Sequence, residues 1–199
     1  MYNTGKSIHE YFSEESRRTA KEVEAEYGYQ VNLCIELINA QFKVLERTSW
    51  TLANSDFSGR GVTEPALFST LHKGTFLFHS VIDLTKRGFY GSANALLRSI
   101  FESLIIAKYV SVSPTASVFN SWIEGEQIHL TNHVFNRIRS PETPELLNLW
   151  KALHKTAHAT VFASQVYLEY DKIQTEIAVN LSIVPLLLCM NQHLGWSEE

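Results

Sequence analysis

The chain has 199 residues, of which 45% are hydrophobic and 19% are charged, and its formal net charge is −4. This length and composition exclude a disordered chain and predict a single domain over residues 1–199 with its own core. The acidic balance gives no overall attraction to nucleic acid or to an anionic membrane.

The first residues, Met1 to Tyr11, are polar and contain no apolar signal segment, so we expect a cytoplasmic protein. Cys34 and Cys189 both lie in apolar helical runs, which predicts two small core residues and not a disulfide. The most apolar run, Ile177 to Met190, is shorter than the roughly 20 residues that span a bilayer. It therefore predicts a buried helix and no membrane segment.

Residues 1–50 predict an N-terminal helical hairpin. A charged amphipathic helix is expected over about 6–26, and a second helix over about 29–49. Apolar residues recur in the second segment at the spacing of one helical face: Val31, Cys34, Ile35, Ile38, Phe42 and Leu45. The polar, glycine-containing stretch that follows, 52–62, is expected to be a loop.

Residues 64–195 predict the core bundle. Helices are expected over about 64–87, 92–111, 114–138, 144–156 and 171–194, whereas 157–170 is ambiguous. Ser113-Pro114 and Thr143-Pro144 are typical of helix starts, and Gly88 and Gly91 are expected to frame a tight turn. Since no segment alternates like a strand, the fold class is an all-α helical bundle of six to seven helices.

The helix at 92–111 is apolar on both faces, which predicts a central, buried position. It nevertheless carries Arg98 and Glu102 one turn apart. Because an unpaired buried charge costs several kcal/mol, we expect the two side chains to pair or to find other partners. One interpretation is a structural ion pair that fixes helix register. The other is a polar pocket built around the two charges.

Two segments carry a resemblance to a known group of proteins. The sequence from Arg87 to Glu102, RGFYGSANALLRSIFE, resembles the LLRSxxE helix of a group of uncharacterised bacterial helical proteins. The sequence from Leu153 to Thr160, LHKTAHAT, resembles a later element of that group that contains a histidine. The resemblance covers about 64–195, and it implies a bundle in which Arg98, Glu102 and His158 converge.

This group is similar to HEPN-type domains, helical bundles that occur in bacterial toxin–antitoxin and phage-defence systems. Many HEPN proteins are metal-independent ribonucleases with an arginine and a histidine close together on one helix. Here an Arg98–His158 pair has to form between helices. The resemblance implies His158 as general base or acid, Arg98 as a phosphate clamp and His154, one turn before His158, as an assisting group.

A metal site is an alternative. Glu126 and His129 form a Glu-x-x-His step, and His133 follows one turn later, so all three are expected on one face of the helix at 114–138. Di-iron bundles use such steps in pairs, and the sequence contains no second one. A mixed site requires helix 64–87 to abut this helix and to supply further ligands, namely His72, His79 and Asp83. Otherwise these histidines flank the apolar stripe as polar interface residues.

The apolar last helix and the four tryptophans, Trp50, Trp122, Trp150 and Trp196, suit a homodimer packed along helices. Neither a P-loop nor a dinucleotide fingerprint occurs, and we expect no cofactor. The leading hypothesis is a HEPN-like component of a bacterial toxin–antitoxin or phage-defence system. It predicts contact with RNA or with a cognate protein, and metal-independent ribonuclease activity is one form that the RNA contact takes. The alternatives are a non-catalytic helical dimerisation protein and a metal-dependent helical-bundle enzyme.

Overall fold

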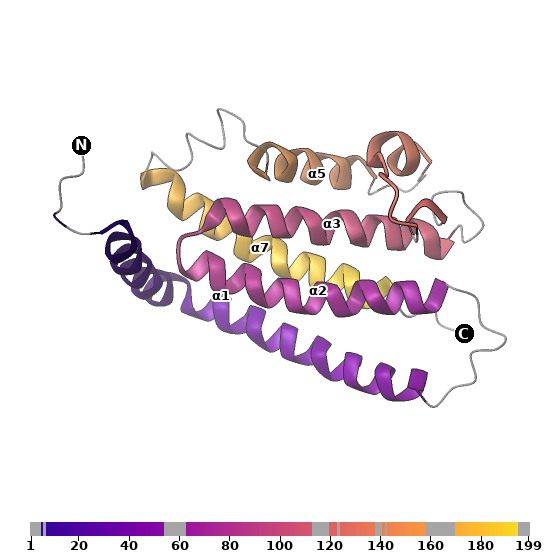
Figure 1. Ribbon diagram of the computed structural model, residues 1–199, viewed down its shortest axis with the longest axis horizontal. Helices are drawn as coiled ribbons and strands as arrows, with labels where there is room; N and C mark the ends of the chain where they lie inside the picture. The colour runs from indigo at the N-terminus through magenta and orange to yellow at the C-terminus, as the bar shows by residue number, and fades with distance from the viewer. Residues whose placement is uncertain are drawn as a thin grey trace.

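The computed structural model describes residues 5, 7–53, 63–112, 120–122, 124–137, 141, 143–157 and 170–194, and every regular element in these ranges is helical (Figure 1). The elements are the helices α1 (Ile8–Ala53), α2 (Thr63–Lys86), α3 (Tyr90–Val112), α5 (Thr143–Ala157) and α7 (Tyr170–Leu194), together with a short π-helix, η1 (Leu130–Phe135). The predicted all-α bundle is confirmed.

Helix α3 is the centre of the bundle. It packs against α2, α5, α7 and η1, while α1 packs against α2 and α7. Figure 1 shows α1 along one edge and α5 along the opposite edge, with α2 and α3 between them and α7 behind. The apolar surface on both faces of α3 explains this position, because each face meets a different neighbour.

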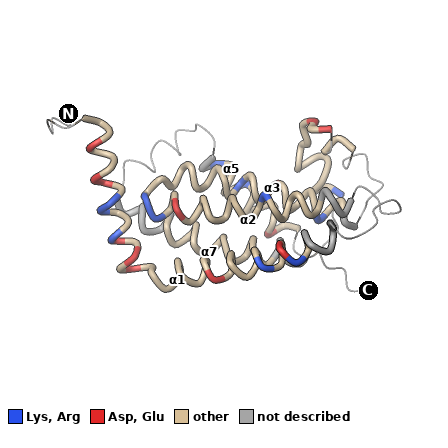
Figure 2. The backbone as a smooth tube through the Cα atoms, turned by 60° about the horizontal axis from the view of Figure 1, so that its bottom comes forward, with Lys and Arg blue, Asp and Glu red and all other residues tan. Residues whose placement is uncertain are grey.

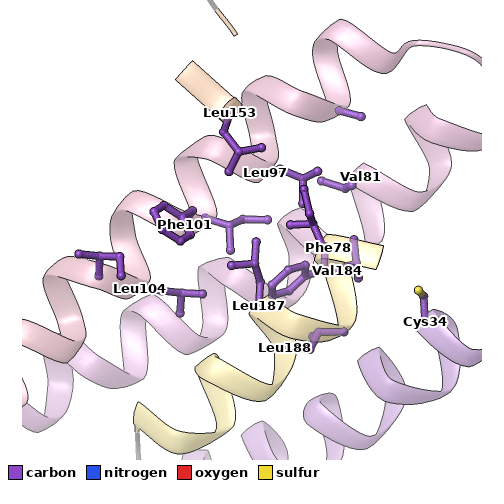
Figure 3. Close-up of a cluster of buried hydrophobic side chains, with 14 of the residues drawn as sticks. Cys34, Phe78, Val81, Leu97, Phe101, Leu104, Leu153, Val184, Leu187 and Leu188 are labelled. Atoms are coloured by element: carbon purple, nitrogen blue, oxygen red, sulfur yellow. The ribbon is translucent and has the colours of Figure 1, made fainter. Parts of the chain in front are cut away.

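The core forms where α2, α3 and α7 meet. Figure 3 shows Phe78 of α2, Leu97 and Phe101 of α3, and Val184 and Leu187 of α7 converging on one volume. All five side chains are buried and have no exposed surface. The prediction that the 92–111 helix is central is therefore confirmed.

The predicted N-terminal hairpin is wrong, because α1 is one helix from Ile8 to Ala53. Gly28 lies in the expected break at 27–28, but a helical glycine costs only about 1 kcal/mol relative to alanine. Val23 before the glycine and Val31 after it are both buried, and this shared burial favours a continuous helix. The N-terminal part of α1 projects past the ends of the neighbouring helices (Figures 1 and 2).

A capping box begins α1. The backbone N–H of Ser7 donates to Glu10 Oε2 at 2.8 Å, and the backbone N–H of Glu10 donates to Ser7 Oγ at 3.2 Å. The hydrogen bonds from Ser7 lower the pKa of the Glu10 carboxyl below its ordinary value. Figure 2 shows acidic residues followed by basic ones and then by acidic ones again along this projecting part of α1, as expected of a solvated helix.

A Schellman motif ends α2 and sets the turn into α3. Gly88 has a φ of 82°, its N–H donates to the Thr85 carbonyl at 3.1 Å, and Phe89 N–H donates to the Leu84 carbonyl at 2.9 Å. This backbone conformation is left-handed, which favours glycine. The predicted turn at Gly88 is therefore confirmed. Gly91 lies inside α3 and takes no part in the turn.

The expected single helix at 114–138 is also wrong. Within the described residues 120–122 and 124–137, a helical turn ends at a bend in which Gly125 has a φ of 74°. Glu126 N–H donates to the Ser121 carbonyl at 2.8 Å and closes that bend, and regular structure resumes only at η1. The left-handed glycine explains the break, since it cannot continue a right-handed helix. The ambiguous segment 157–170 lies almost wholly outside the described residues.

Candidate functional site

The two charged residues of α3 form an ion pair. Arg98 Nε donates to Glu102 Oε1 at 2.7 Å, and the side chains are 21% and 30% exposed, respectively. They lie one turn apart on α3, so the helix itself brings them together. The expectation that the two charges pair is confirmed.

Trp150 of α5 joins this pair from the neighbouring helix. Its indole Nε1–H donates to Glu102 Oε1 at 3.1 Å, so one carboxylate oxygen accepts bonds from both α3 and α5. The Trp150 ring also lies 6.2 Å from the Phe135 ring of η1, measured between ring centroids. Sequence reasoning did not assign Trp150 to this site.

His154 follows Trp150 by one helical turn. Its imidazole lies 5.1 Å from the Trp150 ring between centroids, with the ring planes inclined by 41°, and its Nδ1 is shielded from solvent. We call Arg98, Glu102, Trp150 and His154 the α3–α5 cluster. Three of the four predicted site residues are members of it, whereas the fourth, His158, lies outside the described residues.

The α3–α5 cluster holds groups that suit phosphate and proton chemistry. The Arg98 guanidinium is a planar cation, and Glu102 orients it through Nε. His154 supplies an imidazole, the side chain that exchanges protons near neutral pH. Glu102 partly neutralises the arginine, so an incoming anion has to compete with this carboxylate or bind beside it.

The three candidate ligands at 126–133 do not share a helix face. Glu126 lies in the bend before η1, where its Oε2 accepts a hydrogen bond from Ser121 Oγ at 2.6 Å. His129 and His133 are adjacent, with ring centroids 5.6 Å apart. Among the described residues, no group of three or more histidine, cysteine or acidic side chains is arranged to hold a metal ion.

The other candidate ligands lie elsewhere in the bundle. His72 stacks within α2 on Phe76, with ring centroids 4.9 Å apart, while His79 and Asp83 border α1. His129 and His133 belong to η1 and its N-terminal flank, and η1 packs on α3. The structure does not bring the two sets together.

Residues 65–178 match a protein family described as a family of unknown function, DUF5677. The chain belongs to this family. The DUF5677 region runs from α2 into α7 and includes the whole α3–α5 cluster, whereas all of α1 precedes it. No curated protein and no solved structure gives a significant match. None of the described helices has the length and apolar character needed to cross a bilayer.

Proposed function

We propose that this DUF5677 protein is a HEPN-like component of a bacterial toxin–antitoxin or phage-defence system, and that it contacts RNA at the α3–α5 cluster. The proposal rests on one observation. An arginine, a carboxylate, an indole and an imidazole from two helices meet in a partly buried site, which is the kind of position where functional groups gather.

The cluster contains the parts that metal-independent RNA cleavage requires. A general base takes the proton of a ribose 2′-OH, the 2′-oxygen attacks phosphorus, and the departing 5′-oxygen receives a proton. In the proposed reaction His158 acts as the general base or acid, and His154 assists by carrying the other of these two protons. Arg98 stabilises the negative charge that develops on the phosphoryl oxygens, and Glu102 and Trp150 hold the guanidinium and the α5 backbone in place.

Inducible expression in a bacterial host tests this proposal. We expect wild-type expression to arrest growth and to degrade cellular RNA, and we expect Arg98→Ala, His154→Ala and His158→Ala to relieve the arrest. Arg87→Ala is the matched control, because Arg87 also forms an ion pair one turn away, to Asp83 at 3.2 Å, but on exposed surface.

Harmless expression of the wild type, with intact RNA after incubation with purified protein, would refute the ribonuclease proposal. Relief of growth arrest by Arg87→Ala to the same extent would show that general loss of charge, and not the cluster, is responsible. Each variant is checked by circular dichroism, so that unfolding is distinguished from loss of activity.

A specific feature of α7 favours a second candidate, a non-catalytic dimerisation protein. No charged residue occurs from Ile177 to Met190, and the solvent face of this stretch exposes Val179 by 43% and Leu186 by 50%. Interface centres are depleted of charge in this manner. A second copy packed against α7 covers both side chains.

Light scattering after size exclusion tests this candidate. We expect a dimer for the wild type and a monomer for Leu186→Asp, because a carboxylate at the centre of an interface is costly to desolvate. Phe12→Asp is the control, because Phe12 is 52% exposed but lies on the projecting part of α1. A monomeric wild type rules this candidate out.

A further inference from the structure

A cavity of about 140 Å³ lies between α1 and α2, on the side of the bundle away from α5. Three isoleucines, Ile35, Ile38 and Ile82, supply its apolar lining. A cavity of about 150 Å³ accommodates a benzene molecule, so this space has the size of a single six-membered ring.

The remaining lining of the cavity is polar but nearly balanced in charge. Asn39 and His79 border it, together with Asp83 and Lys86. Asp83 is paired with Arg87 at 3.2 Å, and Lys86 is paired with a glutamate of α1 at 3.4 Å. The site therefore suits an uncharged ring that carries hydrogen-bonding groups on its edge.

Two exposed aromatic rings lie one helical turn away from the cavity, one on α1 and one on α2. Phe42 follows Asn39 on α1, and Phe76 precedes His79 on α2. Their ring centroids are 6.5 Å apart, and they are 43% and 54% exposed. His72 extends this row, with its ring 4.9 Å from that of Phe76. The planes of Phe42 and Phe76 meet edge to face at 89°, so each ring offers its own face, and exposed aromatic faces are the platforms on which unpaired bases stack.

Two lysines lie close to the rings along the helices. Lys43 adjoins Phe42 in sequence, and Lys73 precedes Phe76 by one helical turn and also borders the groove between α2 and α3. Both are exposed, and neither forms an ion pair with any residue in the described ranges. A nucleic acid strand whose bases stack on the rings carries phosphates that such ammonium groups neutralise.

We propose that the α1–α2 surface binds single-stranded RNA, with one pyrimidine base in the cavity and its neighbours stacked on Phe76 and Phe42. This goes beyond the proposed function, because it adds a second RNA contact on helices away from the α3–α5 cluster. Asn39 reads the edge of the inserted base, and the ring-sized cavity favours a pyrimidine over the larger purine. A docked protein segment is the competing occupant of this surface.

Fluorescence anisotropy of labelled oligouridylate and oligoadenylate with the full-length protein tests the proposal. We expect tighter binding of oligouridylate, and weakening of that binding by about tenfold in Phe76→Ala, the loss typical of one stacked base. Asn39→Ala is expected to abolish the preference for uridine. Lys73→Ala is expected to flatten the slope of log Kd against log salt by about 0.7.

Phe12→Ala is the matched control, since Phe12 is 52% exposed on the projecting part of α1 and is expected to bind as the wild type does. Weakening by Arg98→Ala but not by Phe76→Ala would overturn this proposal while supporting RNA contact at the α3–α5 cluster. Weakening by Phe76→Ala alone supports the α1–α2 surface and shows that the cluster does not hold RNA. If neither oligonucleotide binds, the proposal of RNA binding at the α1–α2 surface is overturned, and a docked protein segment becomes the favoured occupant.

Discussion

The hydrogen bond from Trp150 to Glu102 ties α5 to the charged pair on α3, and its energy is measurable. We predict that a double-mutant cycle of Trp150→Phe and Glu102→Ala gives a coupling energy of about 1 kcal/mol. The acceptor is charged, and buried bonds of that class contribute about 1.5 to 3 kcal/mol. Because Glu102 is 30% exposed, water recovers part of this energy, which lowers the expectation.

The cycle separates this bond from the other losses. Glu102→Ala also removes the ion pair with Arg98, but that loss is the same in the tryptophan and the phenylalanine backgrounds and therefore cancels. Trp150→Phe also leaves space beside the Phe135 ring, and this packing loss cancels in the same way.

Urea unfolding followed by circular dichroism at 222 nm gives the four free energies. With slopes of about 2 kcal/mol per molar urea, 1 kcal/mol corresponds to a midpoint shift of about 0.5 M. The control cycle combines Glu102→Ala with Trp122→Phe, a half-buried tryptophan in a different contact, and is expected to show no coupling. A coupling below about 0.3 kcal/mol between Glu102 and Trp150 would refute the reasoning, because the free-energy changes of mutations at independent sites add only to within about that amount.

Four further predictions concern the bundle. Gly88→Ala is expected to destabilise the protein by about 1 to 2 kcal/mol in urea unfolding, because residue 88 has a left-handed φ and a Cβ there would lie 3.3 Å from the Thr19 methyl carbon. Phe78→Ala is expected to cost about 3 to 5 kcal/mol, because the side chain has no exposed surface and leaves a cavity between α2, α3 and α7. Burial raises the pKa of the Cys34 thiol to about 11 from an ordinary value of 9.0, so a thiol reagent at pH 8 is expected to titrate only exposed Cys189 in the native protein and both thiols after unfolding. The same shift contributes stability below pH 9 that is lost as the pH rises from 9 towards 11, and urea unfolding across this range is expected to show that loss in the wild type but not in Cys34→Ala.

Helices α2 and α5 were predictable because local signals mark their ends. The Schellman turn at Gly88 and the proline after Thr143 placed the boundaries of α2 and α5 within one residue of those found. The apolar surface on both faces of α3 likewise gave its central position. These are properties of neighbouring residues and need no knowledge of the tertiary fold.

The two wrong helix boundaries show where local signals compete with tertiary packing. Gly28 is a weak helix breaker, and the burial of Val23 before it and Val31 after it favours a continuous α1. At Gly125 the outcome is the opposite, because the residue adopts a left-handed conformation that ends the helix. The two glycines look alike in sequence, and only the surrounding contacts separate them.

The candidate site was predictable only in the part that one helix defines. The four-residue spacing of Arg98 and Glu102 forces the pair, whereas the bond from Trp150 depends on how α5 lies across α3, which periodicity does not encode. Trp150 does carry a signal in retrospect. It precedes His154 by one turn, so any contact of His154 with α3 brings the tryptophan to the same face.

The structural and chemical roles of Arg98 are separated by Arg98→Lys. A lysine keeps the positive charge one turn from Glu102, so we expect the free energy of unfolding to change by less than about 0.5 kcal/mol. It replaces the planar fork with a point charge, which grips a phosphoryl group less well. If the cluster cleaves RNA, we therefore expect Arg98→Lys to relieve growth arrest almost as fully as Arg98→Ala does. Full toxicity in Arg98→Lys with unchanged stability would show that the guanidinium serves only as the ionic partner of Glu102, and the functional reading of the pair would then fail.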